Sequence, residues 1–466
     1  MLNRLLGLII AKLFSPLSSF LLIVLIARMW GKENLGQYST VLVWLAIFQF
    51  ISLFGIGEYI SKEVGKDTSR AAKYLLHGLF FGLISSVICI GLMVGGALFI
   101  NYSMEVKYSI VTASIALPFI AATMICQAVF TSFQKIKYIT IASLLESALI
   151  LLMGTAIIFK YFGLITLIRY LVIIRIISAI LNLYIVHKHI VKVRFQFDRD
   201  FFRKLLAPVA VFGITGVAFQ IFMRIDIVIL SRMKNMAEVG LYSSASKLWE
   251  ICLMLPLAFY ILNLPVAAQG YQGPKESAQK KIESYTSTLF VLIFFVFGFM
   301  VFFAESVLQL LYGPSFSGAT SLLRIFMLAF LIQSAEMVLG MICQAAGYHK
   351  AAMNIALIRA GINIVLNIVL ISVIGVLGAA LATLFSILMS FAIFQIFVKR
   401  TLHEFQWITI TVKPALICVG TMCLLFLLAN FLNTTVLWFL FVLVYALMTF
   451  AVNGFSSLKV NTAAPG

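Results

Sequence analysis

The chain has 466 residues, of which 63% are hydrophobic and 11% are charged, and its formal net charge is +18. The charged share is about half that of an average soluble protein, which excludes a string of soluble domains. A basic chain often binds nucleic acid, but a membrane protein with Lys and Arg gathered on one side explains this charge better. We therefore expect membrane lipids as partners and no nucleic acid.

About fourteen apolar stretches, each long enough to cross a bilayer, follow one another with short polar breaks. Because helices satisfy their own backbone hydrogen bonds in lipid, we predict an all-α polytopic membrane protein. The first span is longer than the apolar core of a signal peptide, so we predict that it is retained. In chain order the predicted spans are 5–27, 38–60, 74–100, 108–132, 138–159, 163–186, 205–230, 238–264, 285–304, 319–345, 351–372, 375–398, 412–431 and 435–455.

The spans group as six, six and two, with a basic hinge at 187–204 between the sixes. The predicted domains are an N-terminal six-helix lobe (1–190), a C-terminal six-helix lobe (200–398) and an additional two-helix segment (399–460). Counting Lys and Arg in the short loops and termini gives twenty-one on one side and six on the other. The positive-inside rule then predicts that both termini are cytoplasmic.

Two pairs of segments indicate that the two sixes are copies of one another. VLIARMWGKENLGQYS (24–39) aligns with VILSRMKNMAEVGLYS (228–243), and FTSFQKIKYITIASLLE (130–146) aligns more weakly with QAAGYHKAAMNIALIR (344–359). Each segment keeps its membrane direction in both halves, so the repeats are parallel. Such repeats are related by a pseudo-two-fold axis along the membrane normal, with a substrate path between them.

Two stretches of the chain resemble sequence motifs of a known family. LIARMWGKENLGQYS (25–39) and IGVLGAALATLFS (374–386) resemble motifs of the polysaccharide flippases in the multidrug/oligosaccharidyl-lipid/polysaccharide exporter (MOP) superfamily. The chain departs from the usual motif at Lys32–Glu33, where the family often has Pro–Glu. The last two helices also resemble the extra pair of lipid II flippases, which suggests a groove for the lipid tail.

The resemblance implies a Wzx-type flippase of undecaprenyl-pyrophosphate-linked oligosaccharides. It would move O-antigen or related units for lipopolysaccharide biosynthesis from the cytoplasmic to the periplasmic leaflet of the bacterial inner membrane. Polymerase and glycosyltransferase components of the pathway would be its partners.

Charges inside the predicted spans are the strongest clue to the site, because each costs roughly 2.5–3.5 kcal/mol at the bilayer centre. The cations that we expect to bind the pyrophosphate are Lys12, Arg224, Lys247, Arg324 and Arg359. Carboxylates that are candidates for proton or sodium coupling, or for charge pairing, are Glu58, Glu146, Asp226, Glu250 and Glu336.

Internal pairing is the alternative for these cations, since Lys247 and Glu250 have helical salt-bridge spacing and Arg224 is two residues from Asp226. Arg359 aligns with Glu146 across the repeat, so these two are a further candidate pair, although a structural role is the preferred interpretation of Arg359.

The predicted mechanism is alternating access, in which the two halves rock about Pro16 and Pro208. No metal motif or nucleotide loop is present, so we expect no cofactor and no catalysis. One rival is a multidrug exporter of the same fold. Such an exporter would favour an aspartate for sodium or protons in the first span, but the only charge of that span is Lys12. The other rival is a membrane-embedded polysaccharide polymerase or glycosyltransferase.

Overall fold

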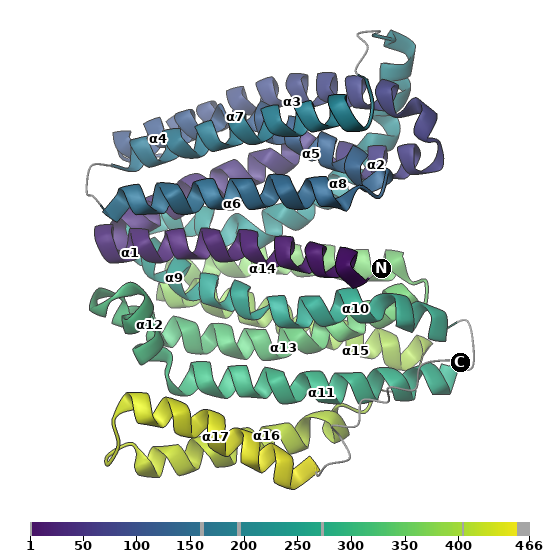
Figure 1. Ribbon diagram of the computed structural model, residues 1–466. Helices are drawn as coiled ribbons and strands as arrows, with labels where there is room; N and C mark the ends of the chain where they lie inside the picture. Colours follow the sequence, from purple (N-terminus) through teal and green to yellow (C-terminus); the bar gives the residue numbers. More distant parts are fainter. Residues whose placement is uncertain (1, 159–162, 193–196, 272–274, 403–404, 454–466) are drawn as a thin grey trace. The chain divides into compact units, whose positions relative to one another are not determined.

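The computed structural model describes the backbone of residues 2–158, 163–192, 197–271, 275–402 and 405–453. Side chains are described for the same residues except 2–15, 157–158, 207–208, 210–212, 214–223, 275–281 and 451–453. Regular structure in this part of the chain is helical throughout (Figure 1). The helices are α1 (Leu2–Leu53), α2 (Ile56–Lys66), α3 (Ala71–Phe99), α4 (Met104–Ser114), α5 (Leu117–Ser132), α6 (Ile136–Ile158), α7 (Leu164–His189), α8 (Arg199–Met233), α9 (Met236–Cys252), α10 (Met254–Gly270), α11 (Lys275–Phe302), α12 (Ala304–Tyr312), α13 (Thr320–Ala345), α14 (His349–Ile374), α15 (Val376–Thr401), α16 (Trp407–Leu428) and α17 (Thr434–Asn453), with short 3₁₀ turns at Thr68–Arg70 and Pro314–Ala319.

The membrane fold follows the predicted spans. Eleven helical stretches of the described chain are long and apolar enough to cross a bilayer. One of them, Pro16–Leu53, includes parts of the first two predicted spans, 5–27 and 38–60, and Gly31 with φ 80° lies between those two spans. Thr434–Phe450 is a shorter apolar helix, and α8 covers the seventh predicted span. The predicted all-α polytopic fold is therefore confirmed.

Proline explains two breaks in spans that were predicted to be continuous. The predicted span 108–132 is split between α4 and α5, and 238–264 is split between α9 and α10. α4 ends four residues before Pro118, and α9 ends four residues before Pro256. A proline has no N–H to donate to the carbonyl four residues earlier, so each helix ends at that carbonyl.

A third break lies between α1 and α2 and interrupts the predicted span 38–60. Phe54 has φ 42° and Gly55 has φ 79°, so two consecutive residues are left-handed. A right-handed helix cannot continue through them. A Cβ on Gly213 of α8 would lie 2.4 Å from the Phe54 carbonyl oxygen, so glycine makes room for this break.

The second pair of repeated segments folds in the same way in both halves. α5 is followed by Gln134 with φ 54°, and α13 is followed by Gly347 with φ 87°. The amide of the next residue donates to a carbonyl five residues earlier, at 2.9 Å after α5 and at 2.8 Å after α13. Both are Schellman-type helix ends. The turns lie at aligned positions, which supports the weaker repeat.

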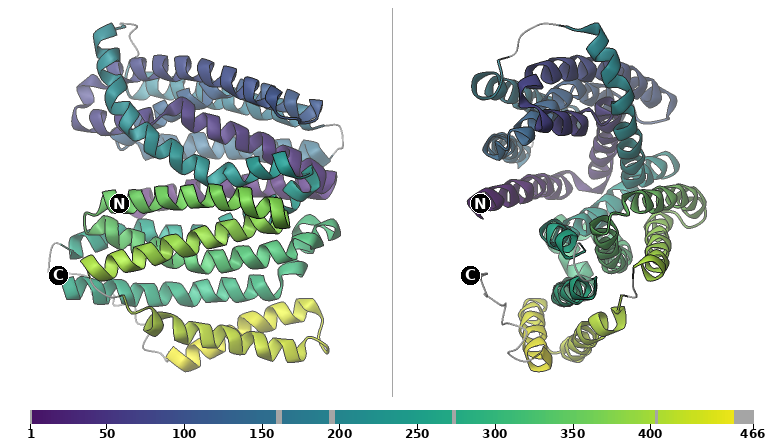
Figure 2. Two further views of the ribbon diagram at one scale, coloured as in Figure 1. Left: turned by 180° about the vertical axis from the view of Figure 1, so that it is seen from behind. Right: turned by 90° about the vertical axis from the view of Figure 1, so that its right-hand side faces the viewer.

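Contacts divide the chain into two compact units, residues 1–243 with 367–379 and residues 244–366 with 380–466. In the first unit, α1 packs on α6 and α8, while α5 packs on α3 and α7. In the second, α13 packs on α10 and α11, and α11 packs on α16. α16 and α17 lie side by side as a helical pair (Figure 2). The division into domains at 1–190, 200–398 and 399–460 stays a prediction.

Candidate functional site

The first pair of repeated segments meets at a very close helix crossing within the first unit. A Cβ on Gly36 of α1 would lie 1.8 Å from the carbonyl oxygen of Met236, at the start of α9. A Cβ on Gly240 would lie 1.8 Å from the carbonyl oxygen of Lys32. Only glycine permits this approach of backbone to backbone.

The crossing is also reciprocal. Lys32 aligns with Met236 just as Gly36 aligns with Gly240, so each copy makes the same contact with the other. Reciprocal contacts of this kind are the signature of a two-fold relation. The local geometry therefore supports the pseudo-two-fold axis that parallel repeats predict.

Each half contains a polar cluster that joins an arginine, a glutamate and a serine. In the first unit, Glu146 of α6 forms an ion pair with Arg175 of α7. The hydroxyl of Ser178 donates to the other carboxylate oxygen at 3.1 Å. The predicted coupling candidate Glu146 is thus held by two partners on α7.

In the second unit, Arg359 of α14 donates to Glu336 of α13 at 2.9 Å, and the hydroxyl of Ser390 donates to Glu336 at 2.7 Å. Arg359 is 6% exposed and Glu336 is 7% exposed. A buried pair of this kind is stable only because each charge has its partner. The geometry matches the structural role that was preferred for Arg359.

The two clusters occupy related places in the repeat but distribute their charges differently. Ser178 and Ser390 both occupy the fifteenth position of their helices, α7 and α15. The aligned residues Glu146 and Arg359 each have a partner in their own unit, Arg175 and Glu336 respectively.

Two further cations have defined positions. Nζ of Lys247 lies 2.7 Å from Oε2 of Glu250, one turn along α9, which is the internal pairing that its spacing suggested. Arg324 is exposed, and its Nε donates to the carbonyl of Val301 at 3.4 Å. Two of the five predicted cations, Lys247 and Arg359, thus pair with carboxylates, and the role of all five in binding substrate stays a prediction.

The remaining predicted residues lie on α1 and α8. Asp226 accepts a hydrogen bond from the hydroxyl of Tyr242, which is the aligned tyrosine of the repeat. Arg224 is half-buried on the same helix. Lys12 and Pro208 lie in α1 and α8, but their side chains are outside the described residues.

A cavity of about 580 Å³ lies in the first unit, beside the break between α1 and α2. Residues of α1, α2, α5, α6 and α8 line it. Its polar side chains are those of Glu58, Ser61, Lys62, Gln127 and Thr131. Its volume lies within the range of roughly 300–1,000 Å³ that small-molecule sites occupy.

Sequence reasoning found only one of these polar residues as a candidate for the site, the carboxylate Glu58. Gln127 and Thr131 were missed because uncharged polar residues are common in membrane helices. Their spacing of four residues on α5 was the available signal, since it places both on one face of the helix. The spacing of Glu58 and Lys62 on α2 is the same.

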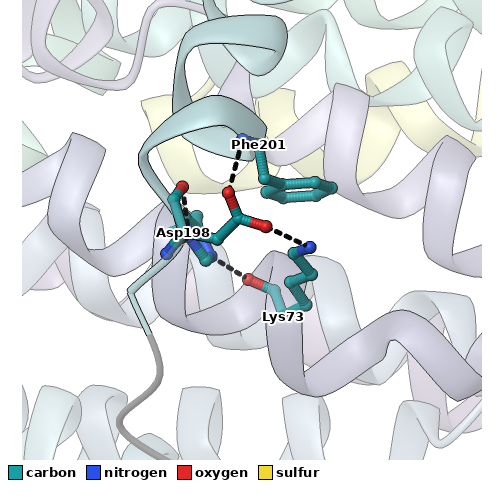
Figure 3. A network of polar contacts seen from close by, with 4 residues as sticks. Lys73, Asp198 and Phe201 are labelled. Atoms are coloured by element: carbon teal, nitrogen blue, oxygen red, sulfur yellow. Dashed lines mark hydrogen bonds and ion pairs between the residues drawn. The ribbon is translucent and has the colours of Figure 1, made fainter.

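Asp198 of the basic hinge binds residues at the start of α3 (Figure 3). Nζ of Lys73 lies 2.6 Å from Oδ2 of Asp198, and the amide of Phe201 donates to Oδ1 at 2.9 Å. Buried His77 accepts the Asp198 amide at Nε2, at 2.9 Å, while its Nδ1 faces the Lys73 carbonyl at 2.7 Å. The Lys73 ammonium and then the Phe201 amide lower the pKa of Asp198 to about 2.

Among the described residues, no three His, Cys, Asp or Glu side chains gather as metal ligands.

Two archaeal proteins are similar in sequence. A probable low-salt glycan biosynthesis flippase of Haloferax volcanii is 25% identical over 178 residues, which is 37% of this chain and 37% of that protein. The chain thus matches little more than a third of that flippase. An uncharacterized membrane protein of Methanocaldococcus jannaschii is 22% identical over 405 residues, covering 83% of this chain and 94% of that protein.

Two solved structures show the same fold. The lipid II flippase MurJ in an inward closed conformation has a TM-score of 0.78 and 16% identity, covering 96% of this chain and 98% of its own. A multidrug resistance MATE family transporter of the MOP superfamily, in an inward-facing conformation, has a TM-score of 0.70 and 15% identity. That match covers 86% of this chain and 99% of the transporter.

Two family profiles match the sequence. The profile of the polysaccharide biosynthesis protein family matches residues 2–270, which is more than half of the chain. The MatE profile matches residues 212–369. The chain therefore belongs to the polysaccharide biosynthesis protein family, within the MOP superfamily that its motifs resemble.

Proposed function

We propose that this protein is a flippase, and not an enzyme, that moves lipid-linked oligosaccharides from the cytoplasmic to the outer leaflet of its membrane. The observation that carries the proposal is the reciprocal crossing at Gly36 and Gly240 in a chain of this family. Parallel repeats about a two-fold axis are an architecture of alternating-access transporters, in which the substrate path lies at the repeat interface. The Haloferax relative, a probable low-salt glycan biosynthesis flippase, supports the same substrate class.

The finer proposal names the carrier and the membrane. The carrier is undecaprenyl pyrophosphate, and the glycan is an O-antigen unit or a related surface polysaccharide of lipopolysaccharide biosynthesis. The membrane is the bacterial inner membrane, and both termini are cytoplasmic, as the Lys and Arg distribution supports. Polymerase and glycosyltransferase components that use the same lipid-linked unit are the proposed partners.

The energetics suit outward movement of an anion. A charge that crosses a potential of 100 mV gains or loses about 2.3 kcal/mol, so an anionic pyrophosphate moves downhill out of a negative interior. Among the predicted cations we rank Arg224 first, since a planar guanidinium matches the phosphate oxygens and, of the three arginines, Arg359 is paired with Glu336 and Arg324 is exposed. The potential is the proposed drive, with no cofactor. A proton or sodium gradient acting through a carboxylate such as Glu58 or Asp226 is the alternative drive.

Export of drugs is the second candidate function. The MatE profile and the MATE-like fold favour it, but that profile matches a shorter part of the chain than the polysaccharide profile does. The lipid II flippase also covers 96% of the chain, against 86% for the MATE transporter. The difference is about the length of α16 and α17 together, which favours a flippase with its extra helical pair.

Deletion of the gene in its host tests the proposal. We expect lipid-linked glycan to accumulate on the cytoplasmic side and surface glycan to fall, and both to recover when the gene is restored. Accumulated intermediate is identified by mass spectrometry of the extracted lipids. A deletion strain that keeps its surface glycan and becomes sensitive to cationic drugs would instead assign drug export.

A further inference from the structure

The cavity beside α2 exists because one face of this short helix is buried and the other is not. Ile56, Ile60 and Val64 recur every four residues and are fully buried in the core of the first unit. Gly57 and Glu58 lie on the other side of α2 and line the cavity. The left-handed residues Phe54 and Gly55 separate α1 from α2, and Phe50 and Leu53 at the end of α1 line the cavity beside them.

The cavity contains polar groups with hydrogen-bonding capacity to spare. Within the described part of the chain, the carboxylate of Glu58 and the side-chain amide of Gln127 have no hydrogen-bond or ion-pair partner. The hydroxyl of Thr131 donates to the backbone carbonyl of Gln127 at 2.8 Å, so the hydroxyl oxygen is still able to accept a hydrogen bond. A carboxylate accepts, and an amide both donates and accepts, so the set suits a ligand with several hydroxyls.

The charges of the cavity do not favour an anion. Glu58 and Lys62 lie one turn apart on α2, so a negative and a positive side chain line the same wall. A phosphate gains from the lysine but is repelled by the carboxylate. A neutral sugar is not repelled by the carboxylate and donates its hydroxyls to it, while its apolar ring face suits Phe50 and Met124 in the lining.

We propose that this cavity binds a sugar residue of the lipid-linked glycan, with Glu58 and Gln127 as partners of its hydroxyls, and does not bind the pyrophosphate. The inference rests on the proposed function and adds a sugar subsite to it. Glu58 is then a substrate-binding residue and not a coupling residue. The volume of about 580 Å³ leaves room for a sugar with a neighbouring one.

Two glycines of α2 provide a matched test. Nothing lies within 4 Å of a Cβ built on Gly57 or on Gly65, so a Cβ at either position meets no clash. Gly57 lines the cavity and Gly65 does not. Gly57→Leu therefore fills the cavity, while Gly65→Leu adds the same side chain elsewhere on the same helix. Glu58→Gln tests the carboxylate, and Glu63→Gln, which removes the partner of Lys66, is its control.

Binding is measured in nanodiscs with two probes. One is the lipid-linked glycan fraction extracted from the deletion strain, and the other is bare undecaprenyl pyrophosphate. We expect Gly57→Leu to weaken binding of the glycan-bearing lipid at least tenfold and to leave the bare lipid unchanged. Glu58→Gln should weaken only the glycan-bearing lipid, by about five- to tenfold, because a charge-assisted hydrogen bond becomes a neutral one. The control variants should match the wild type with both probes.

The outcomes separate this inference from the proposed function. Wild-type protein that binds the glycan lipid, together with a Gly57→Leu variant that binds it equally well, overturns the sugar site and leaves the flippase standing. Equal loss of both probes in Gly57→Leu assigns the cavity to the carrier phosphate and overturns the inference. Wild-type protein that binds neither probe overturns the inference together with the function on which it rests.

Discussion

The crossing of α1 and α9 predicts that a single methyl group at Gly36 destabilises the protein. A Cβ there would lie 1.8 Å from the Met236 carbonyl oxygen, whereas carbon and oxygen in a close Cα–H···O contact are about 3.3 Å apart. The two backbones must therefore separate by about 1.5 Å in Gly36→Ala. Overpacking of this kind costs about 1–3 kcal/mol. We expect the same loss for Gly240→Ala, because the contact is reciprocal.

The free energy of unfolding is measured by SDS titration of the purified protein in detergent micelles. Gly65→Ala is the control, since a Cβ at that helical position meets nothing within 4 Å. It should be neutral or should stabilise by up to about 1 kcal/mol, as alanine usually does in place of a helical glycine. The double variant of Gly36 and Gly240 should lose less than the sum of the single losses, since both act on one contact.

The result that refutes this reasoning is a Gly36→Ala variant as stable as Gly65→Ala. The backbones would then not approach as closely as the geometry requires. The two-fold argument at this crossing would fail with it, and so would the observation that carries the proposed function.

Three further changes have defined outcomes. Glu336→Ala leaves the buried guanidinium of Arg359 without its carboxylate and should cost about 3–5 kcal/mol in the same titration, while replacing both residues by Met should restore most of the loss. Gln134→Gly should stabilise by about 1 kcal/mol, because a left-handed non-glycine residue is strained, whereas Gly347→Ala at the aligned turn should destabilise by a similar amount. The pKa of Asp198 is about 2, below its ordinary value near 4. The stabilisation that its ionised carboxylate gives to the start of α8 is therefore complete above about pH 5 and is lost as the pH falls toward 2. Hydrogen exchange at the start of α8 should show this loosening, and Asp198→Asn should remove its pH dependence.

Each of these predictions has a contradicting result. A loss below 1 kcal/mol in Glu336→Ala would mean that the guanidinium reaches water or another acid. A Gln134→Gly variant that is less stable than the wild type, or a Gly347→Ala variant that is more stable, would contradict the equivalence of the two turns. Exchange at the start of α8 that is as pH-dependent in Asp198→Asn as in the wild type would point to another titrating group.

The repeat was the most informative feature of the sequence for the site. The alignment of Gly36 with Gly240 identified two residues that the structure brings into contact, although nothing in the alignment requires contact. The charged residues were less informative. A charge in an apolar span must find water or a partner, but the partner of Glu336 is 23 residues away on another helix. The local pair of Lys247 and Glu250, by contrast, was visible as spacing.

The cavity shows where sequence reasoning reaches its limit. Its polar side chains come from two helices that are separated by about fifty residues of chain, and three of the five carry no charge. Hydropathy predicted one continuous span through Phe54 and Gly55, because both residues are compatible with an apolar helix in composition. The left-handed backbone that ends α1 there depends on the packing of Phe54 against Gly213, which is more than 150 residues away.

The sequence by itself determined the solvent, the polytopic helical fold, the internal repeat and the family, because each is a property of composition or of order along the chain. Hydrophobic length is set by the bilayer, and a duplicated segment keeps its pattern whatever it contacts. The tertiary structure alone decided which charges on different helices pair, where α1 ends and which polar groups share a cavity. These depend on distances between helices that lie far apart in the chain, and no periodicity within one helix encodes them.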